Sequence, residues 1–109
     1  MAKIDIITLS GLTAGDGSVI ESGATVKFDS EFHAASTDIR IMLQVYRNRE
    51  LFEAGYSNIQ IPEETLPYDF ILNIAEEEYY VLTPAVLYQH VCDYLNALIP
   101  NTFEIEIIT

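Results

Sequence analysis

Residues 24–47 read ATVKFDSEFHAASTDIRIMLQVYR, and this stretch decides the fold. One row of mainly apolar side chains recurs at every second position through residues 26–33 and again through residues 38–46. The short segment 34–37 separates the two rows. A period of two on both sides of such a break predicts a β-hairpin, because successive side chains of a strand point to opposite faces of a sheet.

The register of this hairpin also follows from the pattern. A turn centred on residues 35–36 places both apolar rows on one face and sets acids against basic side chains on the other. A shift by one residue would set apolar side chains against polar ones throughout, so the pattern selects a single register. The pairs that this register predicts are Val26–Val45, Phe28–Leu43, Phe32–Ile39, Glu31–Arg40 and His33–Asp38.

The chain after this hairpin admits two interpretations. Residues 48–49 can form a two-residue turn, because Asn tolerates the positive φ that such a turn requires. Val45 would then face Phe52, and residues 24–56 would form a three-stranded meander. The alternative is a helix over residues 38–53, but its apolar side chains would be spread around the helix, so we favour the strands.

The rest of the chain supplies further strands and one helix. Thr83 is a suitable N-cap and Pro84 suits the first helical position, so the apolar spacing that follows predicts a helix over residues 84–99. The prediction is one α+β domain, residues 1–109, whose mainly antiparallel sheet of five to seven strands carries the helix on one face. Further strands are expected at residues 3–9, 19–20, 68–74, 79–82 and 102–109, with loops at 10–18 and 55–67 and an acidic break at 76–78.

The charge of the chain is unevenly distributed. Seventeen acids and five bases give a net charge of −12 at pH 7, and all five bases lie before residue 50. Contacts with a nucleic-acid backbone need clustered Lys and Arg, so we expect no specific nucleic-acid binding. An acidic surface suits a basic protein partner, repulsion of nucleic acid, or solubility alone.

No catalytic or cofactor-binding motif is present in the sequence. The glycine-rich segment 10–18 lacks the Gly-Lys-Ser/Thr ending of a phosphate-binding loop, and no helical pattern follows it. His90 and Cys92 lie two positions apart on the predicted helix, so their side chains diverge and do not share a metal. We interpret His33 as the partner of Asp38, and Cys92 as a small core residue. We therefore expect no catalytic residue, no metal, no cofactor and no enzymatic activity.

The sequence has no pattern typical of a membrane span, a signal peptide or a disulfide framework, and this bears on where the protein is located. No apolar run approaches the length of a membrane span, and the N-terminal segment does not match a signal peptide, because Asp5 interrupts its apolar part. The single cysteine excludes an internal disulfide framework. These features predict a protein of the cytoplasm or of a virion, with no membrane partner.

The second half of the chain holds the acids that no base compensates. Both termini are predicted strands, and terminal strands readily form sheet edges that pair with another chain. A solvated turn is the alternative interpretation of the acidic run, and protection of a strand edge is the alternative for the C-terminal acids. The candidate interaction surface consists of Glu76, Glu77, Glu78, Glu104 and Glu106.

In its general character, as a small acidic α+β domain, the chain resembles small head–tail and tail proteins of tailed phages and prophages. No single motif carries the resemblance, so it assigns no functional residue. It implies a structural subunit of the virion that self-associates into a ring or another oligomer, whose acidic lumen would repel the phosphates of DNA. The alternative is an acidic inhibitor, such as an antitoxin, an immunity protein or a DNA mimic, that covers a basic site on its partner.

Overall fold

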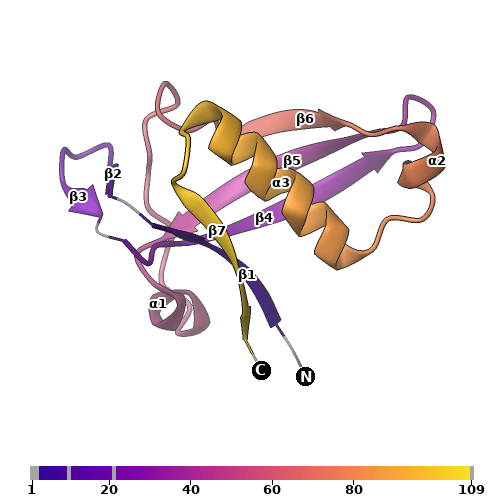
Figure 1. The fold of residues 1–109 in the computed structure, drawn as a ribbon. Helices are drawn as coiled ribbons and strands as arrows, with labels where there is room; N and C mark the ends of the chain where they lie inside the picture. The colour runs from indigo at the N-terminus through magenta and orange to yellow at the C-terminus, as the bar shows by residue number, and fades with distance from the viewer. Residues whose placement is uncertain (1–2, 10, 21, 109) are drawn as a thin grey trace.

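A five-stranded antiparallel sheet forms the body of the protein (Figure 1), in a computed structural model that describes residues 3–9, 11–20 and 22–108. The order of its strands is β6-β5-β4-β1-β7. The predicted α+β fold with a mainly antiparallel sheet is therefore confirmed. The strands are β1 (Lys3–Thr8), β4 (Thr25–His33), β5 (Asp38–Tyr46), β6 (Asp69–Asn73) and β7 (Phe103–Ile108).

The long hairpin of β4 and β5 has the predicted register. Both strands contain nine residues and pair along their whole length. The turn 34–37 closes at Thr37, whose φ of 50° lies in the left-handed region. The predicted pairs are all present: Val26–Val45, Phe28–Leu43, Phe32–Ile39, Glu31–Arg40 and His33–Asp38.

The first and last strands lie side by side, with β1 between β4 and β7. β1 pairs with β7 along its full length, but with β4 only at Ile6–Val26 and Ile7–Thr25. Beyond these two positions β1 and β7 diverge from the long hairpin (Figure 1). The strands predicted at residues 3–9 and 102–109 are confirmed in these elements, although residue 109 lies outside the described residues.

The predicted second hairpin is wrong, because residues 48–49 begin a helix. The Oδ1 atom of Asn48 accepts a hydrogen bond from the backbone N–H of Leu51 at 2.9 Å and caps α1 (Arg49–Glu53). Asn serves as an N-cap as readily as it occupies a tight turn, so the sequence alone did not separate the two. In this helix the ring of Phe52 packs edge-on against Tyr46, with 4.9 Å between ring centroids.

The third strand beside the hairpin therefore comes from further along the chain. β6 pairs with β5, so the strand predicted at residues 68–74 is confirmed, whereas the meander over 24–56 is not. Val45 forms an isolated bridge with Ile59 instead of facing Phe52. The helix considered over residues 38–53 is also excluded, because β5 is extended through Tyr46.

The predicted extended segment 79–82 is wrong as well. Glu76–Tyr79 form the short helix α2, in which the carbonyl of Ala75 accepts the N–H of Tyr79 at 2.8 Å. Acidic side chains are favoured in a first helical turn, where they face the positive end of the peptide dipoles. This helical turn also buries Tyr79, whose ring lies 5.8 Å from the ring of Phe32. Glu76 and Glu77 remain exposed to solvent.

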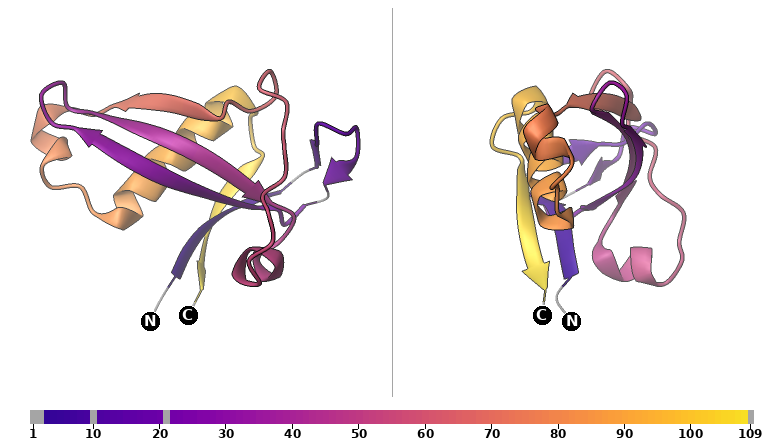
Figure 2. Two further views of the ribbon diagram at one scale, coloured as in Figure 1. Left: turned by 180° about the vertical axis from the view of Figure 1, so that it is seen from behind. Right: turned by 90° about the vertical axis from the view of Figure 1, so that its right-hand side faces the viewer.

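Helix α3 (Pro84–Leu98) crosses one face of the sheet (Figures 1 and 2). Its start is as predicted: the Thr83 hydroxyl accepts a backbone N–H of the first turn at 3.3 Å, and Pro84 is the first helical residue. At the other end, the Asn96 Oδ1 atom accepts the N–H groups of Thr102 and Phe103, at 3.1 and 2.8 Å, and so ties the helix to β7. The buried residues of the helix are Leu87, Val91, Cys92 and Leu95.

The core lies between α3 and the inner face of the sheet. Ile6, Val26, Ile39 and Ile41 on the sheet are 0% exposed, and Val91 of the helix is equally buried. A small second sheet closes one end, formed by β2 (Leu12–Thr13) and β3 (Val19–Ile20), so the short strand predicted at 19–20 is confirmed and the predicted loop 10–18 contains β2.

Candidate functional site

The structure places the five predicted surface acids on two separate elements. Glu76, Glu77 and Glu78 form most of α2, at the far end of the long strands, whereas Glu104 and Glu106 lie on β7 (Figure 1). Glu78 is engaged within the protein, because its Oε1 atom lies 2.5 Å from Nε2 of His90 on α3. The five acids therefore do not form one patch.

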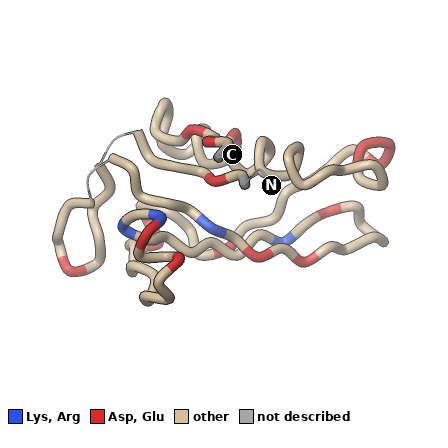
Figure 3. The backbone as a smooth tube through the Cα atoms, turned by 90° about the horizontal axis from the view of Figure 1, so that it is seen from below, with Lys and Arg blue, Asp and Glu red and all other residues tan. Residues whose placement is uncertain are grey.

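The basic side chains are used mainly inside the molecule. Lys27 and Arg49 approach the carboxylate of Asp5, and Arg40 binds Asp69 through two nitrogens at 2.6 and 3.0 Å. Figure 3 shows the basic positions around α1 and along the hairpin, away from the acids of α2. Glu76 and Glu77 of α2 are therefore exposed without a basic position nearby among the described residues, although other acids are spread over the rest of the molecule.

Asp5 is the one charged residue among the described side chains that is fully buried, at 1% exposure. It lies on β1 beside Lys27, and Arg49 Nε of α1 lies 3.5 Å from its second oxygen. The ammonium group of Lys27 also lies 4.8 Å from the centre of the Phe52 ring. This cluster joins α1 to the sheet where β1 leaves β4. No local pattern of residues indicates this cluster, because it depends on the pairing of β1 with β4.

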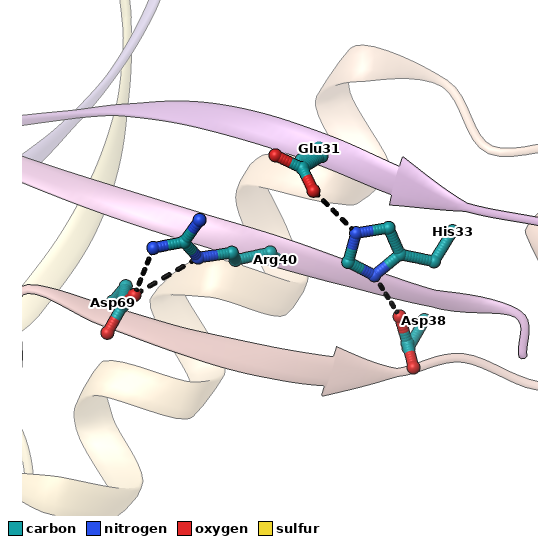
Figure 4. A network of polar contacts seen from close by, with 5 residues as sticks. All are labelled: Glu31, His33, Asp38, Arg40 and Asp69. Atoms are coloured by element: carbon teal, nitrogen blue, oxygen red, sulfur yellow. Dashed lines mark hydrogen bonds and ion pairs between the residues drawn. The ribbon is translucent and has the colours of Figure 1, made fainter.

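His33 lies between two carboxylates on the outer face of the hairpin (Figure 4). Its Nδ1 and Nε2 atoms lie 2.7 Å from Asp38 and 2.7 Å from Glu31, so the predicted pairing with Asp38 is confirmed. Hydrogen bonds to Glu31 and then to Asp38 raise the pKa of His33, and the His33 bond lowers the pKa of Glu31. Glu31 faces Arg40 across the strands as predicted, but Arg40 turns to Asp69 on β6.

The remaining candidates for chemistry lie apart from one another. His90 contacts Glu78, while Cys92 is buried in the core, as predicted, and burial raises the pKa of its thiol. Within the described residues no three His, Cys, Asp or Glu side chains gather as a metal site would require.

Besides the outer edges of β6 and β7, the far half of β4 has no described strand along the side of β1. Val26 pairs with Ile6, and Thr8 N–H donates to the carbonyl of Ala24 at 3.0 Å. Hydrogen-bonding directions alternate along an antiparallel strand, so the even-numbered residues of β4 direct their backbone groups toward the side of β1. The register with β1 ends at Val26. The backbone groups of residues 28, 30 and 32 therefore face an edge at which the described structure has no strand.

The side chains of the same residues face an apolar groove of about 370 Å³. It lies between β4 and the beginning of α3, where the ring of Phe28 lies 4.7 Å from that of Tyr88. Phe32 is 50% exposed, although it belongs to the row of side chains that points toward the core. The walls are formed by Phe28, Ser30 and Phe32 on one side and by Leu82, Pro84 and Tyr88 on the other.

Sequence reasoning missed this groove, although one signal for it was present. Ser30 interrupts the apolar row of β4, and a polar side chain in that row indicates that the far half of the strand is not covered by the core. The divergence of β1 is the structural cause, because this six-residue strand accompanies β4 at only two positions before it leaves the hairpin.

Comparisons with known proteins assign no family to this arrangement. No protein-family model, no curated protein and no solved structure matches the chain. None of the helices in the described part of the chain combines the length and the apolar character that crossing a membrane requires.

Proposed function

We propose that this protein is a non-enzymatic structural subunit that joins a larger assembly through the edges of its sheet. The observation that carries the proposal is that β6 and β7 lie at the opposite edges of one sheet, with no described strand beyond either. An uncovered edge offers a row of backbone donors and acceptors to another chain.

The geometry of the β6 edge supports such pairing. Leu43 N–H donates to the carbonyl of Tyr68 at 2.7 Å, so the even-numbered residues of β6 face β5. Asp69, Ile71 and Asn73 consequently direct their backbone groups outward. The side chain of Ile71 is 44% exposed. Arg40 forms an ion pair with Asp69, which reduces the repulsion between this edge and another acidic chain.

The β7 edge also directs backbone groups outward, so it can pair with the β6 edge of another copy. Ile6 of β1 directs its backbone groups toward β4, so Asp5 and Ile7 direct theirs toward Glu106 and Glu104 of β7. Ile105 and Ile107 of β7 therefore direct their backbone groups outward, and the side chain of Ile107 is 66% exposed. Both edges thus combine free backbone groups with an exposed isoleucine.

Pairing of β7 in one copy with β6 in the next is a head-to-tail contact, and repetition of such a contact generates a closed ring or a filament. Glu104 and Glu106 would lie at the subunit boundary. A ring with acids on its inner surface would let DNA pass without binding it. This arrangement is in keeping with a head–tail or tail component of a phage or prophage.

Light scattering coupled to size-exclusion chromatography tests the proposal, at increasing protein concentration and at low and high salt. We expect oligomers that grow with concentration and with salt, because salt screens the repulsion between copies of net charge −12. The Ile71→Pro variant removes an outward N–H group from the edge strand and should remain monomeric. The matched Ile71→Thr variant keeps that group and should still assemble.

A chain that stays monomeric at millimolar concentration in high salt would contradict the assembly proposal. Equal assembly of the two Ile71 variants would contradict the role of the β6 edge.

The acidic inhibitor remains the second candidate, because Glu76 and Glu77 are exposed on α2 and no ion pair joins them to a base among the described residues. Under this proposal they would face a basic site of the partner. A complex with a basic nuclease or DNA-binding protein should then weaken with salt, and the double variant Glu76→Gln, Glu77→Gln should abolish it. A complex that survives both changes would exclude this role.

A further inference from the structure

We propose that the far half of β4 and the beginning of α3 form a binding site for an extended segment of a partner protein, which adds to the sheet as a strand. The segment would be amphipathic, with apolar side chains alternating with Lys or Arg. This site is distinct from the β6 and β7 edges of the proposed assembly.

The backbone of β4 offers hydrogen-bonding groups to such a segment. Phe28, Ser30 and Phe32 direct their N–H and C=O groups to the edge that β1 leaves at Val26. A strand laid along this edge would continue the ladder that β1 begins at Ile6. Main-chain hydrogen bonds of this kind provide affinity without regard to sequence.

The groove supplies selectivity on the inner face. The side chains of an added strand alternate between the two faces of the sheet, so every second one would enter the space between β4 and α3. That space is bounded by the rings of Phe28, Phe32 and Tyr88 and by Pro84. Its volume of about 370 Å³ lies within the range of roughly 300–1,000 Å³ that ligand pockets occupy. Apolar side chains are the ones that such walls favour.

The outer face of β4 favours basic side chains in the added strand. Asp29 and Glu31 are exposed there and would flank the intervening side chains of an added strand. Opposite charges in cross-strand positions stabilise a sheet, whereas like charges destabilise it. A strand that matches both faces therefore alternates apolar residues with Lys or Arg.

The same acids argue against a second copy of this chain as the occupant. An antiparallel pairing of two β4 strands centred on Ser30 would set Asp29 of one copy directly against Glu31 of the other. Such a contact opposes like charges at every outer position of the open half. Charge complementarity thus favours a basic partner segment over self-pairing.

Fluorescence anisotropy of a labelled synthetic peptide tests the proposal, with Ile or Val alternating with Lys along its length. We expect saturable binding that weakens with salt. Methylation of the peptide amide nitrogens that face β4 should lower the affinity about tenfold or more, because each methyl group removes one main-chain hydrogen bond. Methylation along the other edge of the peptide should leave the affinity unchanged, and a peptide with Glu in place of Lys should not bind.

Matched protein variants test the site from the other side. Ser30→Pro removes an outward N–H group at an edge, where Pro is tolerated, and should abolish binding, whereas Ser30→Ala should bind as the native chain does. Phe32→Ala should reduce the affinity by removing part of the apolar wall. Backbone amide NMR spectra establish that each variant is folded and should place the peptide-induced shifts at residues 28–32 and 82–88.

Three outcomes would overturn the proposal. The first is equal binding of both methylated peptides, which would leave only non-specific attraction between charges. The second is a set of NMR shifts confined to α2. The third is an oligomer of the native chain that Ser30→Pro dissolves, which would assign this edge to a second copy. Ile71→Pro should bind the peptide normally, so failure of the β6–β7 assembly and failure of this site are distinguishable.

Discussion

Two neighbouring strands, β4 and β5, have the same length, the same alternation and one continuous register, yet they differ in burial. On β5 the inward side chains from Ile39 to Val45 are all buried, at 8% exposure or less. On β4 the inward row begins with Val26 at 0% and ends with Phe32 at 50%. Alternation therefore identifies which face of a strand points inward, but the elements packed on that face determine whether its residues become core.

The difference arises from the neighbours of each strand. β5 has β4 and β6 on its two sides, whereas β4 has β1 at only two positions. The far half of β4 thus has an uncovered backbone edge next to an uncovered apolar wall. A strand can in this way serve as scaffold along one half and as a binding surface along the other.

The largest expected loss of stability comes from replacing Asp5, which lies where β1 diverges from β4. Asp5→Ala leaves Lys27 and Arg49 partly buried without their carboxylate, and removing one partner of a buried ion pair costs about 3–5 kcal/mol. Urea denaturation measures this loss. Asp69→Ala is the control, since its pair with Arg40 is exposed and should contribute less than about 1 kcal/mol. Equal losses would show that Asp5 does not anchor the strands.

The second prediction compares the two strands directly. Ile41→Ala on β5 removes a side chain of 0% exposure and should lower the free energy of unfolding by about 2–5 kcal/mol. Phe32→Ala on β4 removes a half-exposed ring and should cost about 1 kcal/mol. Chemical denaturation of both variants provides the test. A larger loss for Phe32 than for Ile41 would place the far half of β4 in the core.

A smaller effect should come from the opposite wall of the groove. Thr83 caps α3, and replacing a capping Thr by Ala costs about 1 kcal/mol. Thr83→Ala should therefore lower the midpoint of thermal unfolding modestly, while Thr83→Ser should not change it. If Thr83→Ala has no effect, the first turn of α3 does not depend on this cap.

The smallest effect concerns pH at the tip of the hairpin. Hydrogen bonds with Glu31, which contributes most, and with Asp38 raise the pKa of His33 above its ordinary value of 6.5. The folded state therefore binds the proton more tightly than the unfolded chain does. The stabilisation is complete below pH 6.5 and disappears as the pH rises through the raised pKa. In acid it disappears again as the pH falls through the lowered pKa of Glu31. NMR titration of the His33 ring measures the shift, and His33→Gln should flatten this part of the stability profile.

A pKa of His33 at or below 6.5 would contradict the two hydrogen bonds that hold the ring. The variant Glu31→Gln offers a finer test, because it should lower the pKa of His33 while Asp38 remains in place.

Local sequence patterns predicted which helices and strands form better than they predicted which of them lie next to each other. The hairpin register followed from alternation, and the start of α3 followed from Thr83 and Pro84. The short helices α1 and α2 did not. Tyr79 of α2 packs against Phe32, which is distant in the sequence, and α1 begins at Asn48, a residue that suits a tight turn as well as an N-cap. The insertion of β1 between β4 and β7 has no local signature either.

The same limit applies to the candidate surfaces. Charge counting pointed to the glutamates of α2 and β7 but could not show that they lie apart. The groove beside β4 depends on where β1 diverges from that strand, and the polar Ser30 in an apolar row was the only local sign of it. Positions of charged residues can be read from a sequence, whereas uncovered edges require the strand order.

The place of β1 in the sheet also has a consequence for folding kinetics. The hairpin of β4 and β5 joins residues close in sequence and can form early, but the pairing of Ile6 with Ile105 must close a loop over most of the chain. Until that slow step is complete, the edge of β1 that pairs with β7 is exposed along its whole length. The folding intermediate should therefore be the species most prone to strand-mediated aggregation.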